Sequence, residues 1–226
     1  MTTKVCQEHV HIVLNSENAS DTQLRELISV AAEFVTESRT HVIGPEPRCG
    51  DLLPAENELV EPVQQGLSPA IAFAGCHLYR RDPNAVMVYV DAKAQNAAAL
   101  LRKNFESMVE EAESPGCLVS LYLETESHAH LYAWSIYALM ETYRNYCPID
   151  FQIINEIART WNRNPDKTAE LYGKLHNEPV AEYLLSQVKP GYYTRNVRVL
   201  ASTTIAPIRG EGVSDQPIMG DPEDVA

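Results

Sequence analysis

The sequence predicts an α/β (α+β) fold, a two-layer sandwich in which helices pack on one face of a mainly antiparallel or mixed sheet. Short apolar runs rich in β-branched residues alternate with longer runs whose apolar residues recur at helical spacing. The 226 residues are 45% hydrophobic and 22% charged, as is usual for a globular domain, and this regular apolar spacing excludes disorder throughout. We expect one domain over residues 1–208 and a flexible acidic tail over 209–226.

The first predicted unit is a strand followed by a helix. In the strand 5–14, Val10, Ile12 and Leu14 alternate with His9, His11 and Val13, so one face is apolar and the other carries histidines. The run from Ser20 to Gln23 matches a capping box, which satisfies free backbone N–H groups at a helix start. Apolar residues follow at helical spacing at positions 24, 27, 28, 31, 34 and 35.

The middle of the chain changes character. Five prolines and three glycines fall within residues 44–69, which predicts a long loop. Residues 71–79 and 86–90 are expected to be strands joined by a turn, and an apolar stripe over 94–112 predicts a helix.

The last third holds shorter and less regular signals. Residues 117–126 and 192–204 are predicted strands, and Pro148 can begin a helix that runs to about residue 163. Residues 131–146 are aromatic-rich without a clear period, and two shorter helices are expected near 166–177 and 179–188.

Charge and cysteine usage limit the partners and the compartment. The 18 Lys and Arg residues against 31 Asp and Glu residues give a net charge of −13, which opposes binding to nucleic acid and favours a small cationic substrate. Five cysteines without a C-x-x-C pair predict reduced thiols and a cytoplasmic protein. We expect no signal peptide and no membrane contact, because the longest apolar stretch, near 69–75, is far too short to span a bilayer.

Two H-x-H pairs suggest one function, a metal-dependent hydrolase. Residues i and i+2 of a strand share a face, so His9 with His11, or His128 with His130, could each bind one metal ion. A second alternative is a non-enzymatic binding or assembly module that uses the loop 44–69 and the acidic tail.

A third set of residues follows the strand 117–126. Glu126, Ser127 and His128 come directly after it, Trp134 lies 7 residues after the serine, and Cys147 lies 20 residues after it. This arrangement resembles the bacterial branch of the S-adenosylmethionine decarboxylase family. Its proenzymes carry E-S-H, an aliphatic residue, H-T-W-P-E, and then a strand that ends in a catalytic cysteine.

The resemblance implies a pyruvoyl-dependent decarboxylase of S-adenosylmethionine or a related cationic amino acid, a cytoplasmic homodimer or higher homo-oligomer of polyamine biosynthesis. Ser127 would attack the carbonyl of Glu126, and the chain would split there to leave a covalent pyruvoyl group as the cofactor, with no metal. Substrate would form a Schiff base with that group, and Cys147 would return a proton after carbon dioxide leaves. Trp134 would contact the substrate.

The sequence departs from this family at two places. Tyr132 stands where the family has a processing histidine, and His130 is the candidate substitute. Ser135 and Ile136 replace the Pro-Glu that holds the ribose of the substrate, so another cationic amino acid, or a homologue that never processes itself, stays open.

Overall fold

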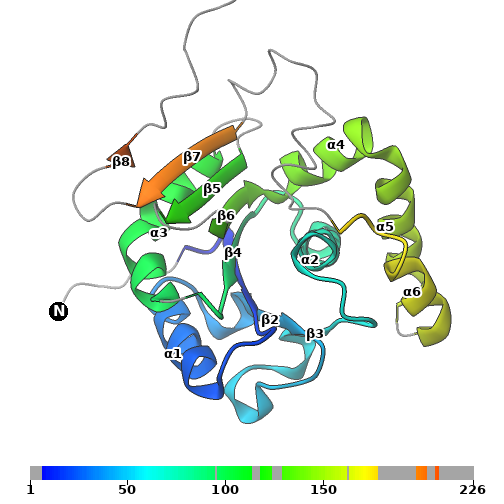
Figure 1. The fold of residues 1–226 in the computed structure, drawn as a ribbon, viewed down its shortest axis with the longest axis horizontal. Coiled ribbons are helices and arrows are strands. Elements are labelled where there is room, and N and C mark those ends of the chain that lie inside the picture. The colour runs from blue at the N-terminus through cyan, green and yellow to red at the C-terminus, as the bar shows by residue number, and fades with distance from the viewer. Residues whose placement is uncertain are drawn as a thin grey trace, which may run out of the picture.

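The computed structural model of the chain places most of the first 177 residues and two short later segments. The described residues are 7–94, 96–113, 118–123, 129–161, 163–177, 197–202 and 207–208. They form one eight-stranded sheet with helices on both sides (Figure 1).

The sheet is mixed. Its strands are β1 (Val10–Asn15), β2 (Thr40–Gly44), β3 (Glu58–Val60), β4 (Val86–Asp91), β5 (Leu118–Leu123), β6 (Ala129–Ser135), β7 (Val197–Ser202) and β8 (Pro207–Ile208). They lie in the order β3-β2-β1-β4-β6-β5-β7-β8. The first four strands of that order are parallel, β6 runs antiparallel to both β4 and β5, and β7 is parallel to β5. The predicted α/β class with a mixed sheet is confirmed.

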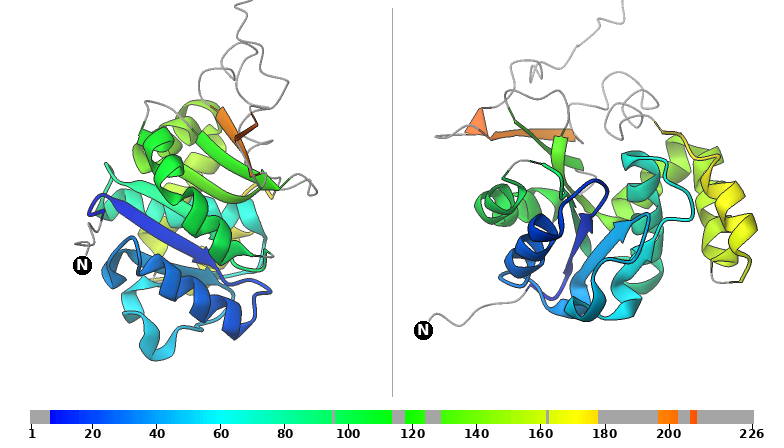
Figure 2. Two further views of the ribbon diagram at one scale, coloured as in Figure 1. Left: turned by 90° about the vertical axis from the view of Figure 1, so that its left-hand side faces the viewer. Right: turned by 60° about the horizontal axis from the view of Figure 1, so that its bottom comes forward.

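Helices cover both faces of this sheet, although they were expected on one. The helices are α1 (Asp21–Ala31), α2 (Leu67–Arg81), α3 (Ala97–Glu113), α4 (Ile136–Tyr146), α5 (Pro148–Thr160) and α6 (Pro165–Tyr172). α1 and α3 pack on one face, and α2, α4 and α5 pack on the other (Figure 2). The reason is that every residue of β1 and β4 is buried, and parallel strands buried on both faces need cover on both.

The first predicted unit is present. Ser20 accepts a hydrogen bond from the backbone N–H of Gln23, and the Gln23 side chain accepts one from the backbone N–H of Ser20, so the capping box forms at the start of α1. The expected polar face of the first strand is wrong. His11 is 5% exposed and lies under α2, because both faces of β1 are covered.

Residues 71–79 were predicted to be a strand and lie instead within α2. A continuous apolar run fits a buried strand and a buried helix equally well by periodicity, and length decides between them. α2 extends over 15 residues, and its residues 68–76 are all buried, which hides the amphipathic pattern that usually marks a helix. The predicted loop 44–69 contains the short strand β3 and the first residues of α2.

Other boundaries follow the sequence more closely. The strands and helices predicted at 86–90, 94–112, 117–126 and from Pro148 correspond to β4, α3, β5 and α5. The stretch 131–146 lacked a period because it joins two elements, β6 and α4, at Ser135, whose Oγ accepts a hydrogen bond from the N–H of Ala138 at 3.5 Å.

Three expectations concern the ends and surroundings of the chain. The helix predicted at 179–188 and the tail 209–226 lie outside the described residues, and the single domain over 1–208 stays a prediction. Within the described part of the chain, no helix has the length and apolar character needed to cross a membrane.

Candidate functional site at the carboxyl ends of the parallel strands

Two polar residues end the two central strands side by side. On the α2 side of the sheet, Val13 of β1 and Tyr89 of β4 belong to one core cluster, and the next residue on the same face of each strand is Asn15 or Asp91. Asn15 pairs directly with Asp91 in the register of β1 and β4. They are 2% and 5% exposed, so a carboxylate and an amide are buried together where both strands end.

The topology gives this position a functional meaning. From β1 the chain continues through α1 to β2 on one side, whereas β4 lies on the other side of β1. The order of the strands therefore reverses between β1 and β4. In open α/β sheets, ligands bind in the crevice outside the carboxyl ends of the strands at such a switch point.

The loop that follows β1 is held firmly beside this point. The Ser16 N–H and the Ser16 Oγ both donate to the carbonyl of Ile43, at 2.8 and 3.1 Å. Arg48 Nη1 donates to the carbonyls of Ser16 and Ala19 at 2.9 and 2.7 Å, and Nη2 of the same guanidinium donates to Asp21 Oδ1. These bonds make the loop a rigid wall, as a preformed ligand site requires.

Asp91 is linked to a basic side chain at the rim. Its Oδ1 accepts a hydrogen bond from the Lys93 N–H at 3.3 Å, and its Oδ2 lies 3.7 Å from the Lys93 ammonium. The Lys93 side chain is half-exposed, while the carboxylate is buried. A ligand at this edge would meet both a hydrogen-bond acceptor and a cation that can turn toward an anionic group.

A buried acid lies behind the same edge. Glu61 comes directly after β3, and its N–H donates to the carbonyl of Gly44 at 2.8 Å. Its Oε1 accepts a hydrogen bond from the hydroxyl of Tyr172 at 2.5 Å, and its Oε2 has no partner among the described residues. Burial raises the pKa of Glu61 to about 7, although the hydrogen bond from Tyr172 lowers it. A carboxyl group with this pKa can give or take a proton near neutral pH.

Tyr89 connects these groups. Its side chain is fully buried, and its hydroxyl has no partner within the described part of the chain. Burial raises the pKa of Tyr89 well above its usual range, and the charges of Glu61 and Asp91 act in the same direction. An unpaired buried hydroxyl costs free energy, so its presence beside two acids is more typical of a site than of a core.

The residues predicted from the decarboxylase motif do not assemble into a described site. Glu126, Ser127 and His128 lie outside the described residues, and of His130 the structure describes only its place in β6. Tyr132 and Trp134 stack on each other in β6, with ring centroids 5.1 Å apart. Both are buried in the core under α2 and α4, where they contribute packing.

Cys147 lies in a different context from the one that the motif implied. In the family, the catalytic cysteine ends a strand. Here the helix α4 separates β6 from Cys147, which is buried and forms the boundary between α4 and α5. The 20-residue spacing from Ser127 to Cys147 therefore covers the strand β6 and the helix α4, whereas in the family it ends in a strand.

His9 and His11 do not converge on a metal site, and His128 of the second pair lies outside the described residues. His9 precedes β1 and bonds Glu113 at 2.6 Å, whereas His11 is buried and its Nδ1 bonds His41 Nε2 at 3.0 Å. Among the described residues, no group of three or more His, Cys, Asp or Glu side chains is placed to hold a metal ion. The expectation of a metal-dependent hydrolase is not supported.

Sequence reasoning did not single out the residues of the site described above. A signal existed for Asn15 and Asp91, since each is a polar residue that ends an otherwise apolar strand. Glu61 and Tyr172 carried no such signal, because they meet across 111 residues of sequence.

Comparison with known proteins rests on the fold. No family model and no curated protein sequence matches the chain. A similar solved structure is mannose-1-phosphate geranyltransferase from Thermus thermophilus, with a TM-score of 0.64 and 12% identity over 85% of this chain and 74% of that one. Another is mannose-6-phosphate isomerase from Helicobacter pylori, with a TM-score of 0.61 and 9% identity over 85% of this chain and 97% of that one.

These similarities correct the interpretation of the motif. At 12% and 9% identity they show the fold alone, and that fold is shared with the transferase and the isomerase, not with S-adenosylmethionine decarboxylase. The expected pyruvoyl decarboxylase, with its self-cleavage between Glu126 and Ser127 and its role in polyamine biosynthesis, is therefore wrong.

Proposed function

We propose that this protein binds a sugar phosphate, free or nucleotide-activated, at the carboxyl ends of β1 and β4, and acts on it as a transferase. The observation that carries the proposal is the buried pair Asn15 and Asp91 at the switch point of the sheet. Open α/β sheets place their ligands at this point.

The chemistry of the residues suits a sugar. Sugar hydroxyls donate and accept hydrogen bonds, and the amide of Asn15 with the carboxylates of Asp91 and Glu61 offers partners for both. The Lys93 ammonium, 3.7 Å from Asp91 and half-exposed, supplies a cation for a phosphate. The names of the two similar structures given above both contain a mannose phosphate, which supports this ligand class.

Glu61 is the proposed acid or base of the reaction. With a pKa of about 7 it is part protonated near neutral pH, and its Oε2 has no partner among the described residues. A transferase that moves a group onto a sugar oxygen must remove a proton from that oxygen, and a buried carboxylate can take it.

Calorimetric titration of the full chain tests the ligand class. The ligands are mannose 1-phosphate, mannose 6-phosphate, GDP-mannose and unphosphorylated mannose, each with and without Mg²⁺. We expect at least one phosphorylated ligand to bind about tenfold or more tightly than mannose, because a charge-assisted bond contributes about 1.5–3 kcal/mol. Failure of all phosphorylated ligands to bind would overturn the proposal.

Two variants test whether the ligand binds at Asn15 and Asp91. Asp91→Asn and Asn15→Ala should each weaken binding by about tenfold. Glu33→Gln is the matched control, because Glu33 is partly exposed and pairs with Arg102, away from Asn15 and Asp91. Unchanged affinity in both site variants would move the ligand elsewhere, and conversion of mannose 6-phosphate into a ketose phosphate would replace the transferase by an isomerase.

We also infer that the protein works in a reducing compartment, which supports the predicted cytoplasmic location. Cys49, Cys76 and Cys147 are buried thiols, which is usual where cysteines stay reduced. The absence of nucleic-acid and membrane partners and the homo-oligomer stay predictions from the sequence, whereas the sugar phosphate proposed here is an anion and replaces the small cationic substrate expected from the net charge.

A further inference from the structure

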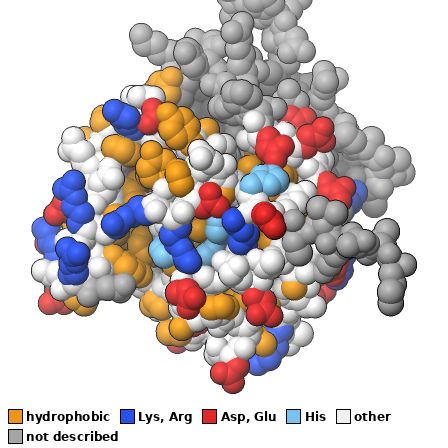
Figure 3. Space-filling view, turned by 180° about the vertical axis from the view of Figure 1, so that it is seen from behind, with side chains coloured by type: hydrophobic (Ala, Val, Ile, Leu, Met, Phe, Trp, Pro, Cys, Tyr) orange, Lys and Arg blue, Asp and Glu red, His pale blue; other side chains and the backbone are white. Residues whose placement is uncertain are grey.

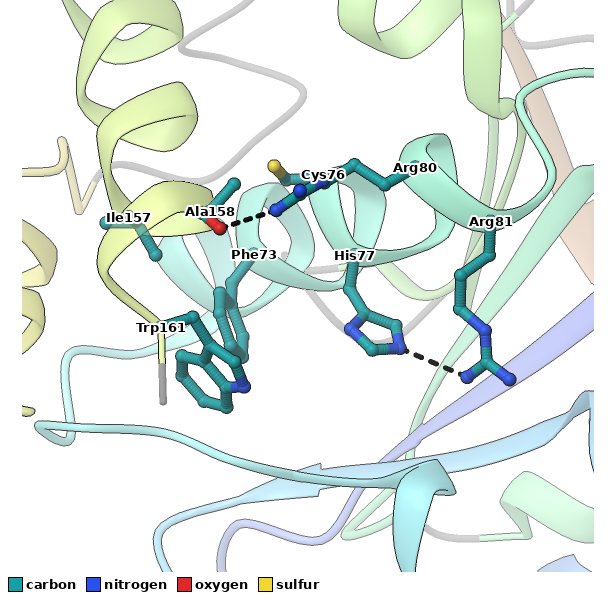
Figure 4. A pocket seen from close by; sticks show the side chains of 8 residues that line it. All are labelled: Phe73, Cys76, His77, Arg80, Arg81, Ile157, Ala158 and Trp161. Carbon is teal, nitrogen blue, oxygen red and sulfur yellow. Dashed lines mark hydrogen bonds between the residues drawn. The ribbon is translucent and has the colours of Figure 1, made fainter. Parts of the chain in front are cut away.

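The structure holds a cavity whose lining includes none of Asn15, Asp91 and Glu61. It has a volume of about 210 Å³ and opens between α2 and α5, with residues of both helices around it (Figure 4). α2 ends at Arg81 and β4 begins at Val86, so this end of α2 lies at the amino edge of β4, opposite to Asn15 and Asp91. The function proposed above gives this cavity no role.

Its apolar part is aromatic. Phe73 of α2 and Trp161, which follows α5, lie side by side with ring centroids 4.3 Å apart and planes inclined by 47°. Ile157 completes this part of the lining (Figure 4). An apolar cavity of about 150 Å³ holds a benzene molecule. The available 210 Å³ therefore accommodates one aromatic ring and one small polar group.

Its polar part consists of bases. His77, Arg80 and Arg81 line the cavity, and no carboxylate among the described residues does. Arg80 Nη1 donates to the carbonyl of Ala158 at 2.5 Å and so ties α2 to α5. In a chain of net charge −13, a cavity lined by two guanidinium groups and by no described acid is complementary to an anion.

The hydrogen bond between Arg81 and His77 defines which donor is left for a ligand. Arg81 Nη1 lies 3.3 Å from His77 Nε2. A guanidinium can only donate, so His77 Nε2 accepts, and the proton of the neutral ring sits on Nδ1. Figure 4 shows His77, Arg81 and Trp161 extending to the same side of α2. The His77 Nδ1–H and the Arg81 guanidinium can thus face one ligand together.

We propose that this cavity binds an aryl acid, a ligand with one aromatic ring and one carboxylate or phosphate. The ring packs against Phe73 and Trp161, and the acid accepts hydrogen bonds from Arg81 and His77 Nδ1. Figure 3 shows one face of the molecule, on which Lys and Arg side chains lie near histidines and a hydrophobic band, with Asp and Glu side chains among them. The ligand class follows from the combination of basic and aromatic side chains. An apolar molecule would make no hydrogen bond with Arg81 and His77, and an inorganic anion would make no contact with the rings of Phe73 and Trp161.

Ligand binding to the cavity can be followed through the indole N–H signal of Trp161. The chain has two tryptophans, and Trp134 is fully buried in the core, so its indole N–H signal is an internal reference for that of Trp161. The full chain is titrated with phenylacetate, phenyl phosphate and the neutral 2-phenylethanol, and the indole signals are recorded by NMR. We expect the Trp161 signal to shift, the Trp134 signal to stay, and an aryl acid to bind about tenfold or more tightly than the alcohol.

Variants separate the two parts of the cavity. Arg81→Gln should remove the preference for the acids and leave the alcohol unaffected. Trp161→Leu should weaken all three ligands, and because it removes the indole reporter its binding is followed by the backbone amide signals. Arg102→Gln is the control, because Arg102 is exposed and pairs with Glu33 on the α1–α3 side of the sheet. Backbone amide spectra report whether each variant keeps the fold.

The outcomes are distinct. A preference for phenylacetate or for phenyl phosphate identifies the acid, and either supports the proposal. Equal binding of the alcohol and the acids would show an apolar crevice only, and the absence of a Trp161 shift with all three ligands would overturn the site. Neither result bears on the carboxyl edge, which Asp91→Asn tests separately.

Discussion

The hydroxyl of Tyr172 donates a hydrogen bond to Glu61 Oε1 at a distance of 2.5 Å. This bond joins the segment after β3 to the last residue of α6. Both side chains are buried, Tyr172 completely and Glu61 almost so. The other carboxylate oxygen of Glu61 has no partner among the described residues, so this bond anchors the acid at the edge where we place the ligand. It also connects the helices packed beside the sheet with the site itself.

Removing the Tyr172 hydroxyl should lower the unfolding free energy and raise the pKa of Glu61. In Tyr172→Phe the acid loses its donor while it stays buried, which costs about 1–3 kcal/mol of unfolding free energy. The hydrogen bond lowers the pKa of Glu61, so the variant should raise that pKa above its value of about 7. Urea unfolding and carboxyl titration by NMR measure the two effects. Tyr137→Phe, at a residue 52% exposed, is the control and should change neither.

The raised pKa of Glu61 predicts a specific pH dependence of stability. Unfolded, the acid releases its proton near pH 4.5, but folded it keeps the proton up to about pH 7. The folded state binds more protons between these values, so this group's contribution to the unfolding free energy falls as the pH rises from 4.5 to 7.

Glu61→Gln isolates that contribution, because glutamine keeps an oxygen for Tyr172 but does not titrate. The difference in unfolding free energy between the protein and the variant should change by about 1–3 kcal/mol from about pH 4.5 to about pH 8, in favour of the unaltered protein at the acid end. A difference that is constant with pH would contradict the raised pKa.

His11, His41 and His77 lie near the opposite edge of the sheet from Glu61. Their contribution to the unfolding free energy should rise with pH, whereas that of Glu61 falls. Arg39 Nη1 donates to His11 Nε2 at 2.9 Å, which places the proton of His11 on Nδ1, from where it is donated to His41 Nε2. The Nδ1–H of His41 is then buried without a partner among the described residues. Burial, reinforced by Arg39, lowers the pKa of His11 to about 4, burial lowers that of His77 to about 4, and burial also holds the pKa of His41 well below its usual range.

Acid should therefore destabilise the protein through these rings. The unfolded histidines take up protons near pH 6.5, whereas folded His11 and His77 stay neutral down to about pH 4, so unfolding free energy is lost as the pH falls through this interval. Asp82 and Arg81 also face this group, and Asp82 opposes the shift of His11.

The double variant His11→Leu/His41→Leu tests the histidine contribution. Because both partners of one buried bond are replaced by apolar side chains, stability at about pH 7.5 should change by about 1 kcal/mol or less. The loss of unfolding free energy between about pH 6.5 and about pH 4.5 should shrink by about 2 kcal/mol or more. An unchanged acid profile in the double variant would refute the assignment.

The contact between Gly44 and Ser16 predicts a pair of coupled substitutions. A Cβ on Gly44 would lie 2.1 Å from Ser16 Oγ but 3.5 Å from Ser16 Cβ. Gly44→Ala should therefore cost about 1–3 kcal/mol through overpacking beside the loop after β1. Ser16→Ala removes the clashing oxygen, so Gly44→Ala/Ser16→Ala should be more stable than the sum of the single variants predicts. Chemical unfolding of the four proteins measures this coupling, and strict additivity would contradict it.

The sequence by itself determined the class of the fold and several of its elements. The capping box before α1, the apolar stripe of α3 and Pro148 at the start of α5 are local signals, because the residues that cause the structure are neighbours in the chain. The short apolar runs of β1 and β4 also identified strands. The alternation of histidines with apolar residues in β1, however, did not indicate that this strand is buried on both faces.

The tertiary structure alone decided the identity of the 71–79 run and the location of the site. An apolar run is compatible with a strand or a helix until its neighbours are known, and α2 is a helix because it is buried against β2, α4 and α5. The decarboxylase motif had its serine, tryptophan and cysteine at the family's spacing, but spacing along the chain does not specify whether a strand or a helix fills it.

Asn15, Asp91, Glu61 and Tyr172 show the same limit. They come from four separate elements, and what brings them to one edge is the order of the strands and the packing of α6, which no local pattern encodes. Local propensity follows from adjacent residues, whereas a site at a switch point follows from which strands become neighbours, and this depends on the burial of the whole sheet.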